Sequence, residues 1–202
     1  MSKIKFFIQQ SWLLIVASCC FGLLLAVANA AWSPLIEQNK VDKISKLMAN
    51  IIPAAHYFEQ IETLSVKTSK GKPFDSTLYK AVSDTDKTIG YCFNASGSGF
   101  ADKIELVVGV DAAFEKIAGF DVLFSNETPG FGDKIKSEYY QGQFIDVPAG
   151  KLTLLKSGDP LKIDSDIIAI SGATVSSDAV TKTVNNILGQ MKTQMQQKGL
   201  IQ

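Results

Sequence analysis

The sequence predicts an α+β fold, in which a twisted, mainly antiparallel sheet is flanked by helices and preceded by one N-terminal transmembrane helix. Three observations support this prediction. An uncharged, apolar run of twenty residues covers positions 12–31. Short segments of strand-like composition, separated by turns rich in Gly and Asp, fill the middle of the chain. Near the C-terminus, apolar residues recur every three or four positions, as they do on one face of a helix.

The apolar run near the N-terminus predicts a transmembrane helix over residues 12–32, because about 20 residues are needed to cross the hydrocarbon core. Lys3 and Lys5 precede the run, and the first acidic residue is Glu37. The positive-inside rule therefore predicts a cytoplasmic segment at 1–11, with the rest of the chain on the periplasmic side of a cell inner membrane. Two alternatives remain open, namely cleavage of the segment after Ala30 and lipid attachment at Cys19. All three interpretations put the remainder of the chain on the same side.

Residues 33–58 are expected to connect the membrane segment to a folded domain at 59–202. Helical spacing of apolar residues continues from Ile36 to Ile51, and Pro53 ends it. Val180 to Met195 form the apolar stripe of the last helix, with Ser176 or Ser177 expected as its N-cap. A short helix is predicted at 134–140. The predicted strands are 61–67, 77–82, 88–93, 104–110, 117–124, 152–155 and 167–170.

The composition excludes several classes of function. Acidic and basic residues number 20 each, so no charge excess indicates a nucleic-acid partner. All the basic residues are Lys, so a bound phosphate would need backbone amides, hydroxyls, a Lys or a covalent bond instead of an Arg clamp. Three Cys and one His provide neither a disulfide framework nor the ligand spacing of a metal site. No catalytic acid or base is predicted.

The segment 171–177, with the sequence SGATVSS, joins a predicted strand to the last helix. Its small residues allow close approach of a ligand, and the free amides and dipole of the following helix favour an anion there. Considered alone, the segment is more typical of an ordinary turn with good capping residues.

A second segment, 126–134 with the sequence NETPGFGDK, follows the strand that ends near Phe124. A planar ligand could stack on Phe131 while Thr128 and the backbone supply hydrogen bonds. Considered alone, this segment is again more typical of a surface loop.

Together and in this order, the two segments resemble the FMN-binding domain shared by two proteins. These are the G subunit of the Rnf electron-transport complex and the C subunit of the sodium-translocating NADH:quinone reductase. The matching motifs are ETPGFG at 127–132, SGATVSS at 171–177, and a central hairpin with GVD at 109–111 and KIAGF at 116–120. The short chain suits the Rnf protein better than its relative.

The resemblance implies that Thr174 carries FMN through a phosphoester bond, formed by a separate flavin transferase that uses FAD as donor. The family's motif often has Asp where this sequence has Ile168, and Asp166 lies two residues upstream. Lys134, Lys136 or Lys182 could help to neutralise the phosphate. The implied cofactor-binding residues are Thr174, Ser171, Gly172, Ala173, Val175, Ser176, Glu127, Thr128, Pro129, Gly130, Phe131 and Gly132.

The resemblance further implies an electron-relay subunit of a membrane-bound, ion-translocating oxidoreductase complex of the ferredoxin–NAD type. Its partners would be the integral-membrane and redox subunits of that complex, and no stand-alone catalysis is expected. Two alternatives remain open. The chain could be a stand-alone periplasmic flavoprotein that donates electrons to another reductase, or an anchored binding module without a redox cofactor.

Overall fold

The computed structural model describes residues 3–201 of the chain, and their side chains from residue 10 onward. Met1 and Ser2 of the expected cytoplasmic segment lie outside the described residues, as does Gln202 at the end of the expected domain. The chain divides into two compact units, with the boundary between Lys43 and Ile44. We describe each unit by itself.

The first unit consists of most of a single helix, α1 (Lys3–Ile51). The sequence predicted a membrane helix at 12–32 and a separate connecting helix, but the structure joins them, with Pro34 inside the helix. Pro34 lacks a backbone N–H and so removes one intrahelical bond, while the turns on either side keep theirs. Within the described part of the chain, α1 is the one helix long and apolar enough to cross a membrane, and its apolar stretch is not buried.

The second unit contains a five-stranded antiparallel sheet whose spatial order follows the chain. The α+β fold predicted from the sequence is therefore confirmed. The third strand continues to Ser98, past its predicted end at 93, so the turn to the fourth strand lies at 99–102. The strands are β1 (Tyr57–Lys67), β2 (Pro73–Val82), β3 (Thr88–Ser98), β4 (Lys103–Asp111) and β5 (Ile117–Ser125).

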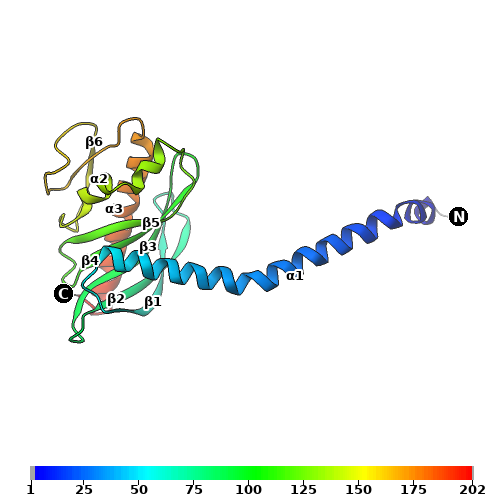
Figure 1. The fold of residues 1–202 in the computed structure, drawn as a ribbon, viewed down its shortest axis with the longest axis horizontal. Helices are drawn as coiled ribbons and strands as arrows, with labels where there is room; N and C mark the ends of the chain where they lie inside the picture. Colours follow the sequence, from blue (N-terminus) through cyan, green and yellow to red (C-terminus); the bar gives the residue numbers. More distant parts are fainter. Residues whose placement is uncertain (1–2, 202) are drawn as a thin grey trace. The chain divides into compact units, whose positions relative to one another are not determined.

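Both faces of this sheet are covered (Figure 1). Phe93 and Val108 point into the larger core, which α3 (Thr174–Gln197) covers. Alternate residues such as Cys92 point to the other face, where they pack with Met48 and other residues of the last turns of α1. The alternation of side chains along each strand thus provides two apolar surfaces.

Short elements complete the second unit and hold the segments around the sheet's edge. The helix predicted at 134–140 is divided in two, because Ser137 adopts an extended conformation. The last two strands pair with each other in parallel, apart from the large sheet. These elements are η1 (Gly132–Lys136), α2 (Glu138–Gln141), η2 (Gly142–Phe144), β6 (Thr153–Leu155) and β7 (Asp166–Ile168).

The start of α3 differs from the sequence prediction. The helix begins at Thr174, and Ala173 occupies the N-cap position without a side-chain cap. The prediction that Ser176 or Ser177 caps the helix is wrong, because both lie inside its first turn. The Ser176 hydroxyl donates to Glu127, and the Ser177 hydroxyl donates to the carbonyl of Ala173.

Candidate functional site

One cavity of about 520 Å³ brings together the two segments that the sequence singled out. This volume is in the range of small-molecule sites, which is roughly 300–1,000 Å³. Three walls enclose it: the turn after β3 (99–102), the loop after β5 (126–132) and the start of α3 with the turn before it. Its lining residues are Phe100, Glu127, Thr128, Phe131, Gly132, Gly172, Ala173, Thr174, Val175 and Ser176.

Most of the residues predicted to contact a cofactor line this cavity, but Ser171, Pro129 and Gly130 do not. The structure adds Phe100, which sequence reasoning missed. Phe100 and Phe131 are both exposed aromatic residues, although they come from separate walls. The signal that could have indicated Phe100 is a large aromatic residue inside a turn rich in Gly and Ser.

The start of α3 presents unpaired backbone donors to the cavity. The first amides of any helix lack partners within it, and here no N-cap side chain replaces those partners. Gly172 precedes this turn with a φ of 80°, a left-handed conformation that glycine adopts without strain. Thr174 is exposed, and no hydrogen bond engages its hydroxyl among the described residues. The helix dipole and the free amides together favour an anion beside Thr174.

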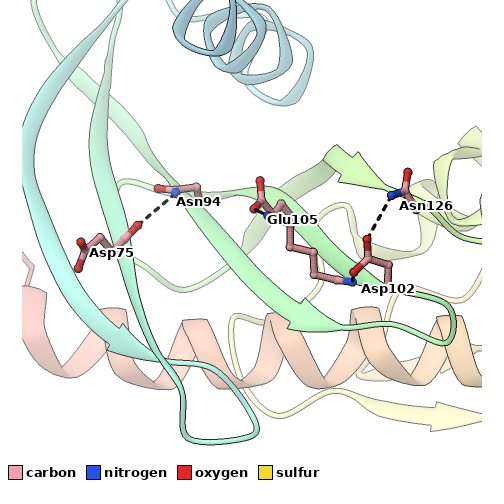
Figure 2. A network of polar contacts seen from close by, with 6 residues as sticks. Asp75, Asn94, Asp102, Glu105 and Asn126 are labelled. Carbon is pink, nitrogen blue, oxygen red and sulfur yellow. Dashed lines mark hydrogen bonds and ion pairs between the residues drawn. The ribbon is translucent and has the colours of Figure 1, made fainter. Parts of the chain in front are cut away.

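The loop 126–132 is fixed by its own turn and by the neighbouring turn 99–102. The backbone N–H of Phe131 donates to the carbonyl of Thr128 over 3.2 Å. Asn126 and Asp102 point toward each other in Figure 2, and the Asn126 amide donates to the Asp102 carboxylate over 3.1 Å. The backbone N–H of Lys103 and the Asn126 amide both hold the pKa of Asp102 below its ordinary value. Two walls of the cavity are thus joined on their exposed side.

Glu127 joins the same two walls to the third from inside. It is 5% exposed, and its Oε1 accepts a hydrogen bond from the backbone N–H of Ala101 over 3.0 Å. Its Oε2 accepts a short hydrogen bond of 2.5 Å from the Ser176 hydroxyl. Among the described residues that line the cavity, Glu127 is the only charged one.

Comparison with known proteins identifies the family. A family model for the FMN-binding domain matches residues 99–189, which include all three walls. The G subunit of an ion-translocating oxidoreductase complex from Methanosarcina acetivorans is 30% identical over 181 residues, covering 90% of this chain and 92% of that protein. The chain belongs to the family of G subunits of ion-translocating oxidoreductase complexes.

Two further comparisons agree with this assignment. The G subunit of a proton-translocating ferredoxin:NAD(+) oxidoreductase complex from Clostridium ljungdahlii is 31% identical, covering 86% of each chain. Among solved structures, the C subunit of the Na(+)-translocating NADH-quinone reductase from Parabacteroides distasonis has a TM-score of 0.57 at 18% identity. The match covers 76% of this chain and 92% of that one, and it supports the fold alone.

The residues of this G-subunit homologue fit FMN, which combines a planar aromatic ring with a terminal phosphate. Exposed aromatic rings and apolar side chains suit the ring, and the free amides at the start of α3 suit the phosphate. Asp133, beside the wall residue Gly132, has a buried Oδ1 without a hydrogen-bond partner. A buried acceptor atom without a hydrogen bond lowers the stability of the fold unless a further group donates a hydrogen bond to it.

Two features that the sequence raised in connection with the G-subunit motif lie outside the cavity. Lys134, Lys136 and Lys182 are not among its lining residues. Lys182 instead pairs with Asp178 on α3 over 2.6 Å. Ile168 lies on β7, where its backbone N–H donates to the Gln143 Oε1 over 2.7 Å and its carbonyl accepts from the Gln143 Nε2. These two bonds between the Ile168 backbone and the Gln143 side chain hold Ile168 in place.

Proposed function

We propose that this protein carries FMN in the cavity at the start of α3, linked covalently by a phosphoester to Thr174. We further propose that it relays electrons as part of a membrane-bound, ion-translocating oxidoreductase of the ferredoxin–NAD type. The relatives from Methanosarcina and Clostridium are named as subunits of such complexes. One observation carries the assignment of the site: Thr174 opens α3 at a cavity whose walls lie within the FMN-binding domain.

Each wall has a separate task in this proposal. The backbone amides of α3 hold the phosphate, because no lining residue offers a cationic side chain among those described. Phe131 and Phe100 provide aromatic surfaces for the ring, and Thr128 offers a hydroxyl for a hydrogen bond. When bound, FMN supplies two-electron acceptance and one-electron release. The protein's own contribution is position and electrostatic environment.

The covalent bond requires that a flavin transferase reaches Thr174. The exposure of Thr174 supports this requirement, as does its hydroxyl, which is free of hydrogen bonds among the described residues. Ile168 stands where the family's motif often has Asp, and its backbone N–H bonds to Gln143. We expect the transferase to recognise the Gly-Ala-Thr turn even without an Asp at position 168. A covalent bond also retains the cofactor where no Arg clamps its phosphate.

The helix α1 supports membrane attachment, and we propose that it is retained, with residues 1–11 cytoplasmic and the domain from residue 59 periplasmic. The apolar side chains of residues 12–27 are largely exposed, so no other part of the described protein covers them. Integral-membrane and redox subunits of the complex are the partners that this location makes accessible.

Replacement of Thr174 by Ala tests the covalent link. The full-length protein is produced together with a flavin transferase, denatured, separated by electrophoresis and illuminated with ultraviolet light. We expect a fluorescent band for the wild type and none for Thr174→Ala, because the acceptor oxygen is lost. Thr193→Ala is the matched control, since Thr193 is an exposed threonine further along the same helix.

Two results would contradict the proposal. A dark wild-type band would exclude covalent attachment. A fluorescent Thr174→Ala band would place the bond elsewhere. Co-purification with integral-membrane subunits separates a relay protein of the complex from a stand-alone flavoprotein.

A further inference from the structure

Glu127 is a carboxylate whose two oxygens are both used by the protein. Oε1 accepts from the Ala101 backbone N–H, and Oε2 accepts from the Ser176 hydroxyl. A group with both oxygens acting as acceptors of protein donors presents little hydrogen-bonding capacity to a ligand. The Ser176 hydroxyl already donates its proton to Glu127, so Ser176 can offer a ligand its backbone amide but not its hydroxyl proton. Neither side chain is placed as a simple cofactor ligand.

The surroundings of Glu127 leave space for this carboxylate and for little else. A Cβ added at Gly99 would lie 2.3 Å from Oε1, and one added at Gly132 would lie 2.8 Å from Oε2. Both distances are far below van der Waals contact, so any side chain at either position would displace the carboxylate. The turn 99–102 and the loop 126–132 thus close around Glu127, and Ser176 connects both to α3.

The charge of Glu127 has no cation opposite it in the cavity. Hydrogen bonds stabilise it, but no Lys is among the described lining residues, and Lys103 pairs with Glu105. A buried negative charge acts over several ångströms with little screening. A flavin becomes more electron-rich when reduced, so a negative charge in the wall of its site disfavours the reduced form.

We propose that Glu127 is a positioning residue that joins the three walls of the cavity and, through its buried charge, lowers the reduction potential of the flavin. The part concerning the potential rests on the proposed function, and the part concerning the walls does not. The two parts separate experimentally, because length and charge can be changed independently at this position.

Glu127→Gln keeps the length of the side chain and removes the charge. Produced in the full-length, flavinylated protein, it should shift the midpoint potential of the flavin to more positive values, as measured by spectroelectrochemistry. Glu115→Gln is the control. It removes the charge of an exposed carboxylate outside the cavity lining, and it should leave the potential unchanged.

Glu127→Asp keeps the charge and shortens the side chain by one methylene, so it cannot reach both Ala101 and Ser176. It should lower the thermal unfolding midpoint of the protein by several degrees, both with and without flavin, while the potential stays near that of the wild type. If Glu127→Gln fails to fold, this variant still tests the role of Glu127 in joining the walls.

The outcomes distinguish the two proposals. An unchanged potential in Glu127→Gln overturns the role of the charge, and an unchanged unfolding midpoint in Glu127→Asp overturns the role in joining the walls. If the wild-type protein binds no flavin, the proposed function fails and the effect on the potential fails with it. The unfolding midpoints of the flavin-free variants then still decide whether Glu127 joins the walls.

Discussion

Cys92 and Glu127 are both buried, yet their surroundings differ. Glu127 accepts hydrogen bonds from two donors. Cys92 lies on the face of the sheet that packs against the last turns of α1, among apolar side chains such as Met48 and Val107. Burial without a donor disfavours the thiolate, and it raises the pKa of the Cys92 thiol to about 12. A thiol in this setting packs as a small apolar group.

We therefore expect Cys92 to resist alkylation by iodoacetamide at pH 8 in the folded protein and to react once the protein is unfolded. At that pH roughly one thiol in ten thousand would be ionised, given the raised pKa. Mass spectrometry of the peptide that contains Cys92 measures this directly. Rapid native labelling would show that the sheet face under the end of α1 opens readily.

The same pKa gives a prediction for alkaline pH. The ordinary pKa of the thiol is 9.0 and the folded value is about 12, so the folded state holds the proton more tightly. The stabilisation is complete below pH 9 and is lost as the pH rises toward 12. The free energy of unfolding should therefore fall more steeply with pH above 9 in the wild type than in Cys92→Ala. Parallel curves from urea titrations would contradict this expectation.

The motifs in the sequence singled out residues that the structure brings together at one cavity, but they did not indicate contacts between distant segments. Cofactor binding by these residues stays a prediction. Thr174 and Phe131 were predicted from their segments, and both line the cavity. Phe100 was not predicted, because its place in the wall depends on the pairing of β3 with β4. For Glu127 a contact with the cofactor was expected, while its bonds to Ala101 and Ser176 join residues far apart in the chain.

At the scale of elements, the junction between β7 and α3 determines where the anion-binding amides lie. The Ser177 hydroxyl accepts from the backbone N–H of Ile170 and donates to the carbonyl of Ala173, both over 3.0 Å. The Tyr140 hydroxyl donates to the carbonyl of Ser177 from the other side. These bonds hold the turn 171–173 between the strand and the helix.

Ser177→Ala should destabilise the protein by about 1–3 kcal/mol, because the buried N–H of Ile170 loses its acceptor. Urea unfolding followed by circular dichroism measures this change. Ser171→Ala is the control, because Ser171 is exposed and should change the free energy of unfolding by less than about 0.5 kcal/mol. Equal effects of the two substitutions would show that the Ser177 hydroxyl does not hold the junction.

Elements with a clear apolar period were predictable, and their ends were less so. The stripe on α3 specifies a buried face, and the structure confirms it, whereas β4 is buried on both faces from Leu106 to Val110. The N-cap of α3 was predicted three or four residues late, because Ser176 and Ser177 are good capping residues whose hydroxyls instead bond to Glu127 and to the carbonyl of Ala173. The membrane helix predicted at 12–32 and the connecting helix after it form one continuous helix, α1, with Pro34 inside.

At the scale of the whole molecule, the boundary between the two units falls inside α1. Residues up to 43 form one unit, and the last turns of α1 belong to the second. Ile44, Met48 and Ile52 are buried against the face of the sheet that carries Cys92. All residues that line the cavity lie in the second unit. The part of the chain expected to connect membrane and domain therefore contributes to the domain's core.

Two truncations separate anchoring from folding. A chain of residues 44–202 keeps the buried side chains of Ile44, Met48 and Ile52, so we expect it to be water-soluble, cooperatively folded and able to bind FMN. A chain of residues 54–202 loses all three. Truncating each such side chain alone to Ala costs roughly 2–5 kcal/mol, and a whole domain is stable by only about 5–15 kcal/mol. The shorter chain should therefore unfold at a much lower urea concentration or aggregate in gel filtration. Equal unfolding midpoints for the two chains would mean that the last turns of α1 act only as a spacer between the membrane segment and the domain.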